Sequence, residues 1–214
     1  MSGKVRSGLF ILLLFVILPL GSIYYMNEGR ISLDKDYKEL EKKGVVPNFS
    51  FVDQYGRVLT QDSLKNKVTI IDFFSTACEG DCPKMIEHFQ TLQEAFGDRP
   101  DVILLSYTTN AATDSSAVLL KYAQRVNAKK DKWFFLTGNQ TELYNIAKAG
   151  YKLPIKGTAE AFVPKSQFIL VDTKMAIRNY YDIEDAETMG KLIKHITRIM
   201  PREKKKGFEF KRET

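Results

Sequence analysis

Cys78 and Cys82 are the only cysteines of the 214-residue chain, and they follow directly on an apolar stretch of strand length. One helical turn between them would place their Cα atoms roughly 6 Å apart, a separation that a disulfide can span. A loop this short adds only about 2 kcal/mol of chain-entropy stabilisation, so a purely structural disulfide or two inert buried thiols explain the pair poorly. We interpret the pair as a functional site, either a redox-active dithiol or two thiolates that bind Cu(I).

The surroundings of the two thiols act on their pKa in opposite directions. A helix that begins near the pair lowers the pKa of a thiol through its free N–H groups. Glu79 and Asp81 lie between the cysteines and raise the pKa. The sequence does not decide between these effects. We expect Cys78, at the start of the loop, to be the attacking thiolate and Cys82 to be the resolving thiol.

A third copper ligand is not evident near the pair. Met85 is three residues after Cys82 and shares its helical face, so it is a weak candidate ligand; the alternative is an ordinary core methionine. The two histidines are His88, about 120° around the helix from Cys82, and His195, on the last predicted helix. Without an imidazole ligand the site should bind Cu(II) only weakly.

The elements that would position these residues alternate between strand and helix. An unbroken apolar run at 68–74 predicts a strand buried on both faces, and a helical pattern follows it up to Phe96. A second strand and helix follow, with Asp114 as the expected N-cap. Further strands are predicted at 133–136, 167–171 and 176–181, with helical patterns at 143–147 and 189–200. Residues 151–163 show no clear period. The pattern predicts an α/β fold, a mixed sheet flanked by helices on both faces.

The N-terminal segment predicts a membrane anchor. The run from Ser7 to Asn27 carries no charge and is long enough to span a bilayer as a helix. Lys4 and Arg6 precede it, which favours a cytoplasmic N-terminus and an extracytoplasmic domain. No transit-peptide pattern is present, so we expect a single-pass protein of the bacterial inner membrane with its domain on the periplasmic side.

The domain organisation follows from these segments. It comprises a basic cytoplasmic start (1–7), a transmembrane anchor (8–26), a polar tether (27–45), a globular domain (46–200) and a basic disordered tail (201–214). Most of the formal net charge of +6 belongs to the two ends. The globular domain is nearly neutral, which argues against a nucleic-acid-binding surface.

Several segments resemble the Sco/SenC family. IIDFFSTACEGDCPKM is similar to the strand and cysteine loop of that family, SYTTNAATDSSAVLLKYA to its next strand and helix, and WFFLTG and FILVDTKMAIRNYYD to its later strands. The resemblance covers about 47–200. It implies a thioredoxin-like fold, copper as the metal, and a subunit of a respiratory oxidase or another thiol or copper protein as the partner.

Two positions depart from the family pattern. Glu79 replaces the proline after the first cysteine, and Pro164 stands where the resemblance places the copper-binding histidine. Related thioredoxin-fold oxidoreductases use a proline near this place, commonly as a cis peptide beside the thiols. Pro164 is therefore a candidate site residue with a cis bond, or an ordinary loop-to-strand proline.

Three functions remain open from the sequence. The leading hypothesis is a membrane-anchored Sco-like protein that uses the CxxxC pair for thiol–disulfide exchange, Cu(I) handling, or both, in assembly of the cytochrome c oxidase copper sites. The alternative is a general thiol–disulfide oxidoreductase similar to the TlpA/ResA group, without a metal role. The third is a non-catalytic partner-binding module.

Overall fold

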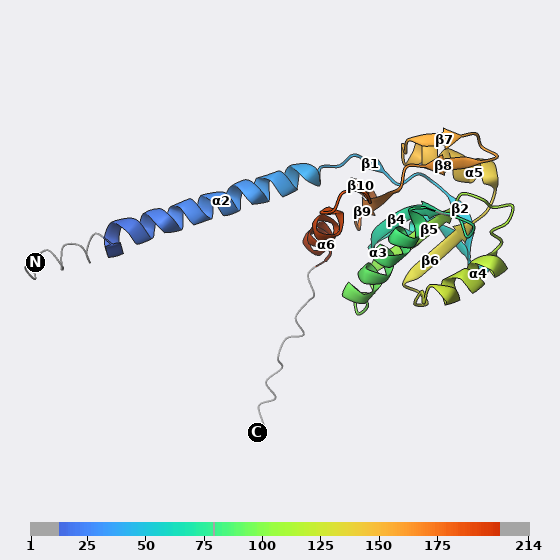
Figure 1. The fold of residues 1–214 in the computed structure, drawn as a ribbon, viewed down its shortest axis with the longest axis horizontal. Coiled ribbons are helices and arrows are strands. Elements are labelled where there is room, and N and C mark those ends of the chain that lie inside the picture. Colours follow the sequence, from blue (N-terminus) through green and yellow to red (C-terminus); the bar gives the residue numbers. More distant parts are fainter. Residues whose placement is uncertain (1–12, 79, 202–214) are drawn as a thin grey trace, which may run out of the picture. The chain divides into compact units, whose positions relative to one another are not determined.

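The computed structural model describes residues 13–78 and 80–201, and it divides between Glu41 and Lys42 into two units (Figure 1). The first unit contains a short π-helix, η1 (Leu13–Ile17), and the helix α2 (Leu18–Glu39). None of the helices in the described ranges is both long and apolar enough to cross a bilayer. The predicted basic start (1–7), the first five residues of the predicted anchor (8–12) and residues 202–214 of the predicted tail lie outside those ranges. Helix α2 continues through most of the segment predicted as a polar tether.

The second unit is built on an eight-stranded mixed sheet with the order β1-β10-β9-β4-β5-β6-β2-β3. The strands are β1 (Gly44–Val45), β2 (Ser50–Asp53), β3 (Val58–Thr60), β4 (Val68–Phe74), β5 (Val102–Thr108), β6 (Trp133–Thr137), β9 (Gln167–Val171) and β10 (Ala176–Asp182). Strands β4, β5 and β6 are parallel, and the remaining neighbours pair antiparallel. The predicted mixed sheet is confirmed.

Strands β4 and β5 form the centre of the sheet. Every residue of both strands is buried, as their mainly apolar patterns predict for strands covered on both faces. Their parallel register places Asp72 opposite Ser106. The carboxyl ends of the two strands therefore meet at one edge of the sheet, where the cysteine loop begins.

Helices cover both faces of this sheet. One face carries α3 (Cys82–Ala95), α4 (Ser116–Arg125) and α6 (Thr188–Ile199). Aromatic contacts fix this arrangement: Phe74 packs on Tyr122 of α4, and Phe89 of α3 packs on Trp133. The other face carries the 3₁₀ turn η2 (Gln61–Leu64), α5 (Gln140–Asn145) and the π-helical turn η3 (Ile146–Gly150).

The segment expected to be irregular contains a small hairpin. Strands β7 (Ile155–Gly157) and β8 (Phe162–Pro164) form a separate two-stranded antiparallel sheet. Gly157 has a φ of +94°, and an added Cβ there would meet the carbonyl oxygen of Ala161 at 2.1 Å, so the tight turn requires glycine. Three-residue strands are too short to show the alternation by which strands are predicted.

Candidate thiol site

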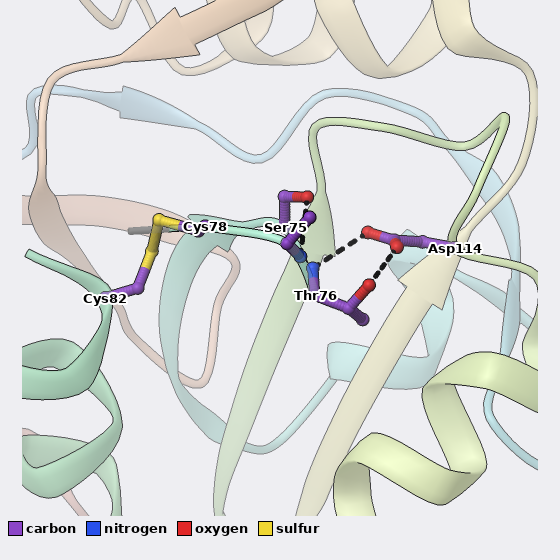
Figure 2. Close-up of a disulfide and its surroundings, with 6 residues drawn as sticks. Ser75, Thr76, Cys78, Cys82 and Asp114 are labelled. Atoms are coloured by element: carbon purple, nitrogen blue, oxygen red, sulfur yellow. Dashed lines mark hydrogen bonds between the residues drawn. A yellow bond between two sulfur atoms is a disulfide. The ribbon is translucent and has the colours of Figure 1, made fainter. Parts of the chain in front are cut away.

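The two cysteines form a disulfide, with their Cα atoms 6.0 Å apart (Figure 2). The bond joins the loop after β4 to the first residue of α3. The Cα separation matches the predicted value, although the connection is not one helical turn. Gly80 has a φ of +78°, outside the right-handed helical region, so the helix begins at Cys82 and not at Cys78. The pair predicted from the sequence is thus brought together.

The two sulfur-bearing residues differ in exposure. Cys78 is exposed, whereas Cys82 is only 6% exposed and contributes to the core. Because Cys82 is the first residue of α3, the free N–H groups at that helix terminus lie next to Cys82. Cys78 is therefore the more accessible cysteine to an outside molecule, and Cys82 is the one that the protein surrounds.

The loop that carries Cys78 is held by Asp114 (Figure 2). This carboxylate is fully buried and accepts hydrogen bonds from the backbone N–H of Thr76 at 3.2 Å and from the Thr76 hydroxyl. The hydroxyls of Thr108 and Thr113 also donate to it. The expected N-cap role of Asp114 is wrong, because the side chain of Ser115 accepts from Val118 N and caps α4. Asp114 fixes the approach to Cys78 instead.

Sequence reasoning missed Asp72 behind the disulfide. Its residue exposure is 4%, and its Oδ1 atom is buried with no hydrogen-bond partner among the described residues. Burial raises the pKa of this carboxyl to about 7, although a hydrogen bond with Ser106 opposes the rise. The available signal was a single acidic residue in the middle of the strand VTIIDFF, where every other residue is apolar or threonine.

Asp72 and Cys82 line one small cavity of about 10 Å³ between α3, α4 and the sheet. Met85 also lines it and is 3% exposed. The predicted weak ligand therefore lies on the inner side of α3, beside the buried thiol and in the hydrophobic core, as the core-methionine alternative requires. Across the cavity, the Trp133 indole N–H donates to the Ser106 hydroxyl at 2.9 Å.

Both histidines have partners elsewhere. His88 packs edge-to-face on Phe168, and burial lowers its pKa. His195 is 1% exposed, and its Nδ1 lies 2.7 Å from the Tyr181 hydroxyl. Within the described ranges, no group of three or more His, Cys, Asp or Glu side chains is arranged to hold a metal ion.

Pro164 ends strand β8 and lines a groove of about 440 Å³ together with Asp81 of the cysteine loop. No cis peptide occurs in the described part of the chain, so of the two alternatives for Pro164 the cis bond is wrong. Lys165 and Asp182 lie in the same groove and form an ion pair at 2.7 Å. The proline lies near the thiol loop, as the sequence predicted, but with an ordinary trans bond in a strand.

Comparison with known proteins identifies the family of the chain. The SCO1/SenC family model matches residues 37–201. The chain belongs to the SCO1/SenC family. A SCO1 protein homolog of Bacillus subtilis is 32% identical over 146 residues, which are 65% of this chain and 75% of that protein. An SCO2-like protein of Rickettsia prowazekii is 23% identical over 154 residues, covering 67% of this chain and 72% of its own.

Solved structures agree with this family. BsSco, described as a Sco-family cytochrome c oxidase assembly protein with a disulfide switch, is 27% identical, with a TM-score of 0.66 over 76% of this chain and 98% of BsSco. Copper-bound ScoI of Bradyrhizobium japonicum is 20% identical, with a TM-score of 0.61 over 72% of this chain and 99% of its own, and shows the fold. This SCO1/SenC chain therefore has the predicted thioredoxin-like α/β fold.

Proposed function

We propose that this SCO1/SenC protein performs thiol–disulfide exchange through Cys78 and Cys82 and handles Cu(I) in assembly of the copper sites of cytochrome c oxidase. The observation that carries the proposal is the asymmetry of the disulfide. Cys78 is an exposed residue on a loop held by Asp114, and Cys82 is a buried residue at the start of α3. An exposed attacking thiol and a sheltered resolving thiol are what a dithiol needs to open and close on a partner.

Copper enters the proposal as cargo. Reduction of the disulfide would free two thiolates whose Cα atoms start 6.0 Å apart, and paired soft sulfur ligands suit Cu(I). An imidazole, which tighter Cu(II) binding needs, would have to come from His88 or His195. The first packs on Phe168 and the second pairs with Tyr181, which supports weak Cu(II) binding. The copper-bound relative and BsSco support copper and oxidase assembly as the setting.

The location is part of the same proposal. The uncharged run from Ser7 to Asn27, with Lys4 and Arg6 before it, supports a single-pass anchor in the bacterial inner membrane. The domain would then face the periplasmic side, where copper sites of oxidases and disulfide chemistry are both accessible. A protease-protection assay on spheroplasts tests this: degradation of the domain from outside is expected, and full protection would contradict the anchor's orientation.

The decisive experiment measures the reduction potential of the pair with and without Cu(I). We expect Cu(I) to stabilise the dithiol and raise the potential strongly, and we expect the reduced protein to bind Cu(I) without a tight nitrogen-ligated Cu(II) species. The Cys78→Ser/Cys82→Ser double variant is the control for copper bound elsewhere. A potential indifferent to Cu(I), with reduction of unrelated disulfides, would instead favour the general oxidoreductase. Full activity of Cys78→Ala would favour the non-catalytic module.

A further inference from the structure

The groove beside the cysteine loop has two walls of opposite charge. One wall is the hairpin of β7 and β8, which stands apart from the main sheet (Figure 1). The other wall is formed by Asp81 of the cysteine loop, by Asp182 at the end of β10 and by Glu184. Because Asp81 directly precedes Cys82, a protein that exchanges disulfides with the cysteine pair must lie over or next to this groove.

The hairpin wall presents two lysines next to an exposed apolar side chain. The antiparallel register pairs Lys156 with Val163, and such cross-strand partners lie on the same face. The backbone N–H of Lys165 donates to the Pro154 carbonyl at 2.8 Å, so the pairing continues to Lys165, which is two residues after Val163 and shares its face. All three side chains are exposed, Val163 to 67%. We call Lys156, Val163 and Lys165 the basic face of the hairpin.

One ion pair joins the two walls within the described ranges, between Lys165 and Asp182 at 2.7 Å. Their hydrogen bond lowers the pKa of Asp182 and raises the pKa of Lys165, to which Glu184 adds, so the pair is ionised at neutral pH. The two side chains are 49% and 34% exposed, and an ion pair so accessible to water contributes little stability. A carboxylate from outside can therefore replace Asp182 on Lys165 at little cost in free energy.

The remaining charges decide which sign of partner the groove prefers. Lys156 takes part in none of the ion pairs found in the described part of the chain. The acidic wall is opposed from within the protein, because Asp182 pairs with Lys165 and Lys84 adds a further positive charge near it. Asp81 directly precedes α3, whose N-terminal N–H groups favour a negative charge. The charge without an internal counterpart is thus positive and lies on the hairpin wall.

We propose that the basic face binds an acidic side chain in the extended segment that flanks the reactive cysteine of the partner. In the complex Lys165 exchanges Asp182 for the partner's carboxylate, Lys156 adds a second positive charge, and Val163 contacts an apolar neighbour of the acidic residue. This inference rests on the proposed thiol–disulfide exchange and names the chemistry of the segment that the site prefers. The two lysines determine specificity and take no part in the exchange itself.

The test uses the full-length reduced protein and synthetic peptides with blocked ends and a single cysteine, activated as a mixed disulfide with thiopyridine. Attack by Cys78 on the peptide sulfur releases uncharged thiopyridone, whose absorbance gives the second-order rate. One glutamate is placed in turn at each position near the cysteine, and matched peptides carry glutamine or lysine there. At the best position we expect the glutamate peptide to react about fivefold faster than the glutamine peptide at low ionic strength, and equally fast in about 1 M salt.

Variants locate the preference on the basic face. Lys165→Glu should reverse it, so that the lysine peptide reacts faster than the glutamate peptide. Asp182→Asn removes the internal competitor and should increase the preference for glutamate by about twofold. Lys191→Glu is the matched control, because it makes the same change of charge on α6, where Lys191 pairs with Asp185 and Glu187 outside the groove. It should leave the preference unchanged.

Reaction with uncharged dithiodipyridine, which needs no groove, should be equal in all variants and shows that the cysteine pair is intact. Glutamate and glutamine peptides that react equally at every position would overturn the role of the basic face. The same holds for a wild-type preference for lysine peptides, or for a preference that Lys165→Glu and Lys191→Glu change alike. These results leave thiol exchange standing, whereas a reduced wild-type protein that does not react with dithiodipyridine would overturn the exchange itself.

Discussion

Cys78 lies on an exposed loop whose backbone is held by a buried carboxylate that accepts from four donors. Cys82 lies at 6% exposure beside a carboxyl whose Oδ1 has no hydrogen-bond partner within the described part of the chain. The two surroundings are built from different elements. Asp114 precedes α4 and reaches the loop, and Asp72 belongs to the central strand. The difference indicates that the fold holds the loop of one cysteine in place and encloses the other cysteine in the core.

The largest expected effect comes from removing either sulfur. Cys78→Ser should abolish exchange with a disulfide substrate, because no exposed thiol remains to attack. Cys82→Ser should retain the first attack and accumulate a stable mixed disulfide, because the resolving thiol is gone. Mass spectrometry after reaction with oxidised glutathione distinguishes the two. Equal trapping by both variants would show that the exposure difference does not assign the roles.

The second-largest expected effect is a dependence of the unfolding free energy on pH that is caused by Asp72. Its folded-state pKa of about 7 is above the unfolded value, so the folded state binds the proton more tightly. Its stabilising contribution is full below about pH 4 and is lost as the pH rises through 7. The wild type should therefore lose about 4 kcal/mol of unfolding free energy relative to D72N between pH 4 and pH 8.

Urea unfolding of both oxidised proteins across this range measures the difference. Because the wild type and D72N share all their other titrating groups, the difference between their unfolding free energies reports Asp72 alone. If the unfolding free energies of the two proteins depend on pH in the same way, then burial does not raise the pKa of the Asp72 carboxyl.

A smaller loss of stability is expected when the loop anchor is removed. Asp114→Ala leaves the Thr76 backbone N–H and three hydroxyls without their acceptor, and should lower the unfolding free energy by about 3 kcal/mol. Ser115→Ala, next in the chain, removes the true N-cap and should cost only about 1 kcal/mol. Thermal denaturation of the two variants shows which substitution destabilises the protein more. A larger loss from Ser115→Ala would mean that capping, and not the loop anchor, is the main role of this segment.

The smallest expected effect concerns the loop between the sulfurs. Gly80 has a φ of +78° in the disulfide form, so Gly80→Ala should strain that form by about 1 kcal/mol and raise the reduction potential by roughly 20 mV. Gly56, with a φ of +77° in the β2–β3 turn, is the matched control. Gly56→Ala should cost similar stability and leave the potential unchanged. Equal potentials for both variants would contradict this expectation.

The sequence was a good guide to the central elements. Strands β4 and β5 are mainly apolar runs, and such runs predict strands covered on both faces. The cysteine pair was also found from the sequence, because its spacing is a pattern within one short segment. The roles of Asp72 and Asp114 depend on partners from other strands and loops, namely Ser106 and the threonines. No local pattern shows such pairings, so Asp114 was mistaken for a helix cap and Asp72 was overlooked.

Of the two alternatives for Pro164, the sequence could not exclude the cis bond, for a related reason. A proline before a strand is compatible with either peptide isomer, and the surrounding structure selects one. Here Pro164 lies in strand β8, opposite Ile155 of β7, with a trans bond. The hairpin that holds it was itself invisible in the sequence, because its strands are only three residues long.

The hairpin of β7 and β8 affects which partner molecules can approach the disulfide. Strands β7 and β8 pair only with each other among the described strands, and β8 forms one wall of the groove beside Asp81. A two-stranded sheet is marginal by itself and depends on anchoring contacts such as the buried ring of Phe162. Substitutions at exposed positions such as Val163 would therefore reshape the approach to the sulfurs while the central sheet and the disulfide stay unchanged. Specificity and reactivity would then evolve on separate parts of the chain.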